Sequence, residues 1–410
     1  MEHRPYAYTS EEEFLKDCAM LERGLPYSKD LSVLGKAIAL GGKCVKNRLL
    51  AQPIEGGDAL ENGAPSQRGN DRYQALAQGG SGLIWMESIS VSEEGKSTPK
   101  QMWLKEDTVE SFAALVEQIH AAGHPIVIAQ LTHSGRNSNP DGNRLAVCAY
   151  ENPKLPKEHM RIITDEELDA LCEDYIQAAI LAEQAGFDGV DIRACHGYLL
   201  NELFSAYERS GKYGGAYENR TRLVKDIVKG VRARTNLIVG VRLNVIDGLP
   251  YPYGWGCDRD DPDKQDMEEP LRLVKELEQL GVDIIDVSAG IGACTPHMIR
   301  PFDRGNVPNE HPLEGVERLL WAAKQIKETA PGVAVAASGF TWMREYAPNV
   351  AAGGIQEGWF DFAGFGRQWI ANPDYANEIL NSGSQTRYCT TCGACMALLK
   401  SGKEMRCVRA

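Results

Sequence analysis

Short apolar runs alternate with amphipathic stretches along most of this chain. Eight runs are rich in valine, isoleucine and leucine and show no regular alternation of apolar and polar positions. That pattern is typical of parallel strands, which are buried on both faces. The eight expected strands are Leu49–Gln52, Gly82–Glu87, Ile126–Leu131, Gly189–Ile192, Ile238–Leu243, Ile284–Ser288, Val333–Ala337 and Phe362–Phe365.

The clearest intervening helix begins after Thr164. Thr164 and Glu167 have the spacing of a capping box, in which the two side chains satisfy each other's backbone N–H groups. The apolar positions that follow recur three or four residues apart, and Gly186 marks the end of the pattern. Those positions are Leu168, Leu171, Tyr175, Ala178 and Ala182.

Eight strand–helix units predict a (β/α)8 TIM barrel of the α/β class with enlarged loops. The alternative is an open doubly wound sheet, which usually carries a Gly-x-Gly-x-x-Gly motif after an early strand. The sequence contains no such motif. We expect three parts: a polar, helix-prone arm over residues 1–30, in which Ser10 and Glu13 have capping-box spacing, the barrel over residues 31–383, and a cysteine-rich segment over residues 384–410.

The charge balance and the N-terminal sequence narrow the functional classes. The 410 residues include 57 acidic and 44 basic ones, which gives a formal net charge of -13. This balance lacks the basic footprint that nucleic-acid binding needs. No apolar run reaches the roughly 18 residues of a membrane span, and the N-terminus lacks the apolar core of a secretion signal. We therefore expect a cytoplasmic protein with no nucleic-acid or membrane partner, whose 11 cysteines are reduced thiols or metal ligands.

Polar residues and glycines follow the ends of the expected strands. In a TIM barrel the chemistry lies at the carboxyl ends of the strands, so these residues would meet at one rim. Gly339 and Arg367 follow the last two strands, where barrels commonly bind phosphate, because glycine lets a backbone N–H approach an anion and arginine provides a charged fork. The other strand-end residues are Pro53, Ile54, Glu55, Ser88, Gln130, Arg193, His196, Tyr198, Arg242, Ser338 and Gly366.

Four cysteines crowd the C-terminal segment. Cys389, Cys392, Cys395 and Cys407 have the spacing C-x2-C-x2-C-x11-C. Scattered structural thiols rarely fall into such an array, so the spacing indicates a metal site. From the spacing alone, both a tetrahedral zinc ion and an iron–sulfur cluster remain open.

Seven segments, in order along the chain, carry a family resemblance. They are residues 46–53, 79–87, 130–136, 186–199, 213–220, 239–242 and 366–367. With these segments, the chain from about Leu34 to Asp374 resembles the old yellow enzyme family of FMN-dependent oxidoreductases. The resemblance implies an FMN-binding TIM barrel in which hydride passes from flavin N5 to an activated C=C bond.

The resemblance also implies roles for individual residues. Gln130 and Arg242 would bind the pyrimidine edge of the flavin, and the fixed charge of Arg242 would stabilise the reduced flavin anion. Tyr198 would deliver a proton to the α-carbon of the substrate, and His196 would hold the electron-withdrawing oxygen of the substrate. Pro53, Ile54, Glu55 and Ser88 would line the flavin ring, and Ser338, Gly339, Gly366 and Arg367 would hold the phosphate.

Two positions depart from the family pattern. Arg193 stands where the family usually has a second histidine or a similar residue. Two hypotheses remain open for it: it binds a substrate carboxylate, or it forms a structural ion pair, for instance with Asp191. Glu55 stands where the family commonly has threonine or cysteine near the flavin C4 carbonyl, and an ionised carboxylate there would make reduction harder. His297, on the loop after the sixth strand, is assigned a role in substrate binding.

A subgroup that includes 2,4-dienoyl-CoA reductase, enoate reductase and trimethylamine dehydrogenase carries a [4Fe–4S] cluster on a similar cysteine segment. The resemblance therefore favours a cluster over zinc and, because exposed clusters are oxygen-sensitive, an anaerobic cytoplasm. In the subgroup a further FAD- and NAD(P)H-binding domain normally follows, whereas this sequence ends at Ala410. Electrons would come from NAD(P)H directly, from a ferredoxin- or flavodoxin-like protein, or from a separate subunit.

These features predict an FMN- and [4Fe–4S]-dependent ene-reductase that acts on a small unsaturated substrate of the enoate, enone or dienoyl type. One alternative is oxidative amine demethylation, with Tyr251, Tyr253 and Trp255 caging a cationic amine. Another is an electron-transfer subunit of a larger complex. The sequence does not specify the substrate, the electron donor or whether the chain forms a homo-oligomer.

Overall fold

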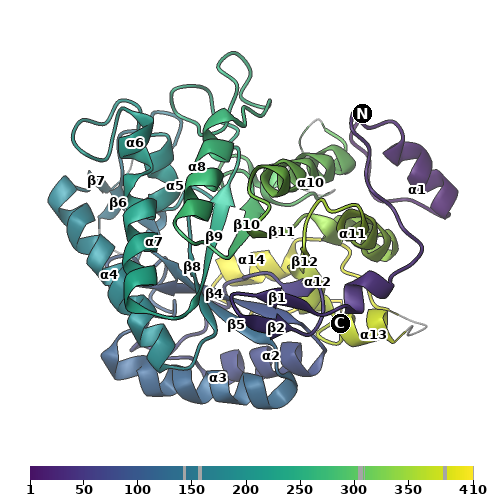
Figure 1. Ribbon diagram of the computed structural model, residues 1–410, viewed down its shortest axis with the longest axis horizontal. Helices are drawn as coiled ribbons and strands as arrows, with labels where there is room; N and C mark the ends of the chain where they lie inside the picture. Colours follow the sequence, from purple (N-terminus) through teal and green to yellow (C-terminus); the bar gives the residue numbers. More distant parts are fainter. Residues whose placement is uncertain (142–144, 156–158, 303–307, 309, 382–385, 410) are drawn as a thin grey trace.

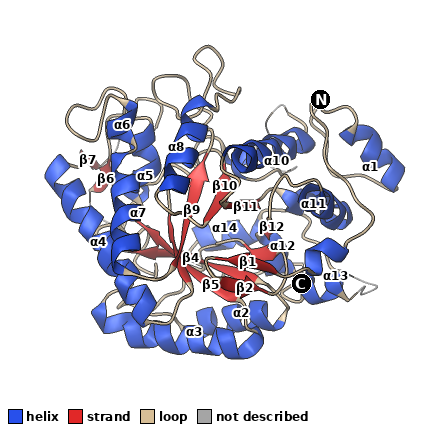
Figure 2. Ribbon diagram, in the orientation of Figure 1, coloured by secondary structure: helices blue, strands red, loops and turns tan. Residues whose placement is uncertain are grey.

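A closed barrel of eight parallel strands forms the centre of the protein, with helices around it (Figures 1 and 2). The computed structural model describes residues 1–141, 145–155, 159–302, 308, 310–381 and 386–409. The strand order is β10-β11-β12-β3-β4-β5-β8-β9, which confirms the TIM barrel and excludes the open sheet. The barrel strands are β3 (Leu49–Ala51), β4 (Leu83–Ser90), β5 (Ile126–Thr132), β8 (Gly189–Ile192), β9 (Ile238–Asn244), β10 (Ile284–Ser288), β11 (Ala334–Ala337) and β12 (Phe362–Phe365).

Each of the eight expected apolar runs forms one of these strands, and the differences lie at their ends. The strand β4 continues to Ser90 rather than ending at Glu87. The register with β5 shifts between Trp85 and Ser88, where β4 has a bulge, and the two strands remain paired beyond it. β11 begins at Ala334, one residue later than expected.

Amphipathic helices cover the outside of the barrel, and α4 (Asp165–Gln184) forms as predicted. Thr164 accepts the N–H of Glu167 at 3.2 Å, and the Glu167 carboxylate accepts the N–H of Thr164 at 2.8 Å. The other long helices are α2 (Gln67–Gln78), α3 (Val109–Gly123), α7 (Arg222–Arg234), α8 (Glu268–Gln279), α10 (Pro312–Thr329) and α11 (Ala347–Gln356). The shorter ones are α1 (Glu11–Cys18), α5 (Leu199–Phe204), α6 (Tyr217–Arg220), α9 (Pro296–Ile299), α12 (Arg367–Ala371), α13 (Tyr375–Leu380) and α14 (Ala394–Lys400).

In the described part of the chain two small sheets accompany the barrel, and one of them closes its amino end. The antiparallel pair β1 (Ile38–Leu40) and β2 (Lys43–Val45) contributes Leu40 and Val45 to a buried apolar group that includes Trp85 from the barrel interior. The interior is therefore filled at this end, and the polar strand-end residues lie at the opposite, carboxyl end. The second small sheet pairs β6 (Ala146–Cys148) with β7 (Met160–Ile162).

The N-terminal arm forms α1 and packs on the outside of the barrel. Phe14 stacks on Tyr346, with ring centroids 4.5 Å apart. The expected capping box is only half formed: Ser10 accepts the N–H of Glu13 at 3.3 Å, but the Glu13 carboxylate accepts the N–H of Thr9 rather than that of Ser10. The contact shifts by one residue because the Thr9 hydroxyl also donates to that carboxylate, at 2.8 Å.

The C-terminal segment folds back against the barrel. The backbone N–H of Cys389 donates to Gln368 Oε1 at 2.9 Å, and Gln368 Nε2 donates to the Arg387 carbonyl at 2.8 Å. These bonds fix the segment to α12, and Figure 1 shows α14 against the barrel. The boundary expected between residues 383 and 384 lies outside the described residues. Among the residues that the structure describes, no helix is both long enough and apolar enough to cross a membrane.

Candidate active site

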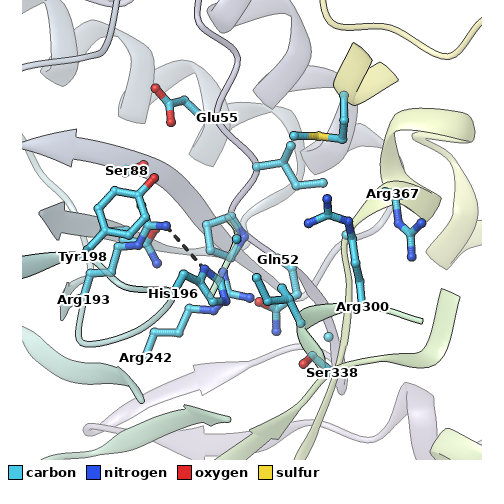
Figure 3. Close-up of a pocket in the computed structure, with 18 of the residues that line it drawn as sticks. Gln52, Glu55, Ser88, Arg193, His196, Tyr198, Arg242, Arg300, Ser338 and Arg367 are labelled. Carbon is cyan, nitrogen blue, oxygen red and sulfur yellow. Dashed lines mark hydrogen bonds between the residues drawn. The ribbon is translucent and has the colours of Figure 1, made fainter. Parts of the chain in front are cut away.

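A cavity of about 490 Å³ lies at the carboxyl ends of the barrel strands (Figure 3). Its size falls in the range of small-molecule and cofactor sites. The structure brings the residues expected to bind flavin together with Arg193 and the two expected catalytic residues. The sequence-predicted residues that line the cavity are Pro53, Ile54, Glu55, Ser88, Gln130, Arg193, His196, Tyr198, Arg242, Ser338, Gly339, Gly366 and Arg367.

One buried carboxylate holds two of the residues expected at the flavin. Asp191 is fully buried and accepts hydrogen bonds from Gln130 Nε2 at 2.7 Å, from Trp85 Nε1 at 2.9 Å and from the backbone N–H of Arg242 at 2.6 Å. Burial raises the pKa of Asp191 to about 6, although these hydrogen bonds oppose the change. Because the four residues come from β4, β5, β8 and β9, Asp191 joins four neighbouring strands through the Gln130 side chain, the Trp85 indole and the Arg242 backbone.

A second buried network includes residues that the sequence did not single out. Gln52 Nε2 donates to Asp286 Oδ1 at 2.8 Å, and Asp286 Oδ2 lies 3.0 Å from Arg242 Nε. Gln52 lines the cavity, and its Oε1 is buried without a hydrogen-bond partner in the described part of the chain. An unpaired acceptor at a cavity wall fits a donor group on a bound molecule. The strand-end rule could have found Gln52, since it directly precedes Pro53.

Tyr198, His196 and Arg193 form one cluster after β8. His196 and Gly197 have left-handed backbone angles, φ +64° and +75°, and this tight turn lets both His196 and Tyr198 line the cavity. The guanidinium carbon of Arg193 lies 3.5 Å from the centroid of the Tyr198 ring, and its Nη2 lies 3.4 Å from His196 Nδ1. His196 Nε2 is 2.6 Å from Ser288 Oγ. Figure 3 shows the three side chains together.

Burial sets the protonation of this cluster. It raises the pKa of the Tyr198 phenol above its ordinary value of 10, although the charge of Arg193 opposes the shift. Burial and the charges of Arg242 and Arg193 hold the pKa of His196 well below 6.5. Near neutral pH the phenol is therefore protonated and the imidazole is neutral.

Glu55 lies in the same cavity wall and accepts a hydrogen bond from Ser97 Oγ at 2.6 Å. Burial raises the pKa of this carboxyl above 4.5, although the Ser97 hydrogen bond opposes the shift. A carboxyl with a raised pKa takes up a proton more readily than an exposed one. Once protonated, Glu55 no longer repels the negative charge of a reduced flavin.

The protonation states predict a flat pH profile for the chemical step. Because Tyr198 keeps its proton and His196 stays neutral, the rate at which an unsaturated substrate oxidises the reduced enzyme should not change between about pH 7 and 9. Anaerobic stopped-flow measurements across this range would check the expectation. If the rate falls below this pH range, protonation of Glu55 is the expected cause, and the fall should vanish in Glu55→Gln. A fall that persists in that variant would contradict the protonation states given for Tyr198 and His196.

The residues expected at the phosphate meet around the ends of β11 and β12. Gly339 has φ +100°, a conformation that favours glycine, and a Cβ there would lie 2.9 Å from Leu319 Cδ1. Arg300, which follows the sixth strand on the same loop as His297, lines the same cavity as Arg367 (Figure 3). Burial and the charge of Arg367 lower the pKa of Arg300 to about 10. Two guanidinium groups that repel each other would be stabilised by an anion bound near both.

A second, smaller cavity lies beside the first, and Arg367 lines both. All four cysteines of the C-terminal segment line this smaller cavity. In the described ranges, however, no three histidine, cysteine, aspartate or glutamate side chains are placed to hold a metal ion. The segment also contributes to the wall of the larger cavity, through Met396, Leu399 and Lys400 of α14.

Two sequence-based assignments are corrected by the positions of the side chains. His297 does not line the cavity, whereas Arg300, three residues later, does. The pKa of His297 is lowered by burial and influenced by Glu310 and Arg318, which places its surroundings near α10 rather than at the cavity. The ion pair between Arg193 and Asp191 is not formed, because the Asp191 oxygens are already occupied by the three hydrogen bonds from β4, β5 and β9.

The aromatic residues considered as an amine cage do not line the cavity either. Trp255 is fully buried, and its indole N–H donates to the Asn244 carbonyl at 2.9 Å. Tyr251 is 40% exposed and packs on Tyr207, with ring centroids 5.1 Å apart. The aromatic loop is thus a packed structural element beside the barrel.

Comparison with known families agrees with this geometry. The model of the NADH:flavin oxidoreductase / NADH oxidase family matches residues 34–385, which is most of the chain. The protein belongs to this family. Old yellow enzyme homologues share its barrel: the homologue from Zymomonas mobilis has a TM-score of 0.67 and 25% identity, over 86% of this chain and 94% of that one.

Relatives in this family differ in length. The NADH oxidase of Thermoanaerobacter brockii is 28% identical over 364 residues, which cover 86% of this chain and 52% of the relative, so the chain spans about half of that protein. The NADPH dehydrogenase of Bacillus pumilus is 32% identical over 255 residues, or 61% of this chain and 71% of the relative. The structure of 2-naphthoyl-CoA reductase has a TM-score of 0.76 at 23% identity, over 92% of this chain and 57% of that one, and shows the shared fold.

Proposed function

We propose that this flavin oxidoreductase is an FMN-dependent reductase of activated C=C bonds that exchanges electrons through a [4Fe–4S] cluster on its C-terminal segment. One observation carries the proposal: a single cavity contains the residues expected to bind FMN together with Tyr198 and His196. The size of the cavity and the unpaired Gln52 Oε1 in its wall both fit a bound flavin.

Bound FMN would supply the hydride that adds to the β-carbon of the substrate. The residues of the chain would do the rest. Gln130, held by Asp191, and Arg242, whose guanidinium lies beside Asp286, would bind the pyrimidine edge, where the charge of Arg242 favours the reduced state. Ser338, Gly339, Gly366 and Arg367 would hold the phosphate. The Tyr198 phenol would deliver a proton to the α-carbon, and the neutral His196 would orient the substrate.

The cluster proposal depends on the cysteine spacing and on the second cavity. A [4Fe–4S] cluster is bonded by four thiolates, each on its own iron, so the thiols surround a cavity instead of converging on a point. All four cysteines line one cavity, and the resemblance to the cluster-bearing subgroup favours a cluster over zinc there. Arg367 lines both cavities, so the two cofactors would be neighbours.

The proposal is tested by purifying the protein under anaerobic conditions and measuring its visible spectrum, iron and sulfide. Flavin absorbance and about four iron and four sulfide ions per chain are expected. Cys395→Ser should lower the iron content, whereas Cys172→Ser, on α4 and outside the segment, should not change it. Absence of flavin would overturn the whole proposal. Zinc in place of iron would leave the reductase and overturn the electron relay.

The electron donor is tested on the same material. Mixing the oxidised protein with NADH or NADPH under anaerobic conditions should bleach the flavin absorbance if nicotinamide is the direct donor. If neither does, the donor is a protein that delivers electrons to the cluster, and reduced ferredoxin should then bleach it.

A further inference from the structure

The charge of the larger cavity is opposite to that of the protein. The chain has a net charge of -13. The described residues that line the cavity nevertheless include five cationic side chains and one carboxyl, Glu55. In the proposed function Arg367 faces the phosphate of FMN and Arg242 its pyrimidine edge. The remaining cations are Arg193, Arg300 and Lys400.

Arg193 is the cation at the reacting end of the cavity. Its side chain is almost completely buried, 7% exposed, and its Nε has no hydrogen-bond partner in the described chain. It contacts the ring of Tyr198 at 3.5 Å and Nδ1 of His196 at 3.4 Å, and neither of them is an anion. The charge of Glu55 also acts on Arg193, but burial raises the pKa of this carboxyl, and its Oε1 accepts a hydrogen bond from Ser97. Arginine cannot lose its proton, and a buried charge without a counter-charge is costly. The site is therefore electrostatically incomplete without an anionic ligand.

We infer that Arg193 binds the carboxylate of the substrate, so that the preferred substrate class is an α,β-unsaturated carboxylic acid. The inference rests on the proposed function and names the substrate of the same site. The position of Arg193 supports a carboxylate because the α-carbon of such an acid is bonded directly to the carboxyl carbon. A guanidinium packed on the Tyr198 ring would hold the carboxylate so that the α-carbon is within reach of the phenol that protonates it.

The chemistry balances with this assignment. The C=C bond gains a hydride at the β-carbon, with two electrons that come from the reduced flavin, and a proton at the α-carbon from Tyr198, which takes a new proton from solvent. As the hydride adds, negative charge grows on the carboxylate oxygens. The fixed charge of Arg193 stabilises this charge more strongly in the transition state than in the bound substrate.

The inference is tested by binding to the oxidised protein, where no turnover occurs. Calorimetric titration compares cinnamate with its neutral analogue cinnamamide. The wild type is expected to bind the acid at least about tenfold more tightly, the effect of one charged hydrogen-bonding partner. Arg193→Met should abolish this preference, and Arg193→Lys should keep part of it, since lysine retains the charge but not the fork. Arg272→Met, whose side chain is 49% exposed on α8, is the matched control and should behave as the wild type.

Equal affinity of the wild type for acid and amide would overturn the inference, as would an undiminished preference in Arg193→Met. If Arg193→Met does not fold, Arg193→Lys decides by the same ratio: an unchanged preference overturns the assignment and a reduced one supports it. The proposed function is judged separately, by flavin absorbance and by reduction of the neutral enone 2-cyclohexenone. A protein that reduces the enone but does not prefer the acid keeps the function and loses the Arg193 assignment.

Discussion

Tyr198→Phe is expected to slow the oxidation of the reduced enzyme by an unsaturated substrate by about 10²–10⁴-fold, the usual contribution of a positioned general acid. The substitution removes only the hydroxyl. In the wild type the Arg193 guanidinium carbon lies 3.5 Å from the centroid of the Tyr198 ring. A phenylalanine ring can keep this contact, so the affinity for substrate should change little. Anaerobic stopped-flow mixing of the reduced variant with substrate measures the effect directly.

The reduction of the flavin provides the internal control for this variant. Its rate should stay at the wild-type value, because no proton passes through Tyr198 in that step. Tyr213→Phe is the matched control: its hydroxyl donates to Asp169 at 2.6 Å, outside the cavity, and its loss should not slow either half of the cycle. An unchanged oxidation rate in Tyr198→Phe would mean that the proton reaches the substrate from another donor.

Asp191→Ala should lower the free energy of unfolding by roughly 3 kcal/mol or more, because three buried hydrogen-bond donors lose their acceptor and each unpaired group costs about 1–3 kcal/mol. The donors are Gln130, Trp85 and the backbone N–H of Arg242. Since two of these residues are expected at the flavin, the variant should also retain less flavin after gel filtration. Denaturant unfolding of flavin-free protein separates the loss of stability from the loss of cofactor.

Two further variants make this prediction specific. Asp191→Asn keeps one acceptor oxygen and should fall between the wild type and Asp191→Ala in both stability and flavin content. Asp226→Ala removes an aspartate that is 41% exposed and paired with Lys229, and it should have little effect. A stability of Asp191→Ala close to that of the wild type would show that water replaces the carboxylate and that the network does not orient Gln130 and Arg242.

The barrel could be predicted from sequence because its strands have a strong local signature. Runs such as Ile238–Leu243 are buried on both faces, so they are apolar throughout and stand out from the helices between them. The ends of the strands were less accurate. β4 continues past Glu87 because its irregular register depends on pairing with β5, which no local pattern encodes.

The residues that line the cavity could be predicted for a related reason. Parallel strands in a closed barrel bring all their carboxyl ends to one rim, so any polar residue that directly follows a strand lies near that rim. Gln130 lies near the carboxyl end of β5 and Tyr198 on the tight turn after β8, and both line the cavity. His297 is not among the lining residues, because the loop and the single-turn helix α9 that contain it follow a path set by packing against other parts of the chain.

By itself, the sequence determined the fold class, the rim on which the site lies and the residue types present there, because these follow from local hydrophobic pattern and from the geometry common to all parallel barrels. Only the tertiary structure decided which charges have partners. Asp191 is occupied by donors from three other strands, and Arg193 Nε has no hydrogen-bond partner among the described residues. The tertiary structure also decided where the cysteine segment lies: α14 contributes to the wall of the larger cavity, and Arg367 lines both this cavity and the smaller one with the cysteines. Such pairings join segments that are distant along the chain, and they depend on the few ångströms by which folded side chains approach one another.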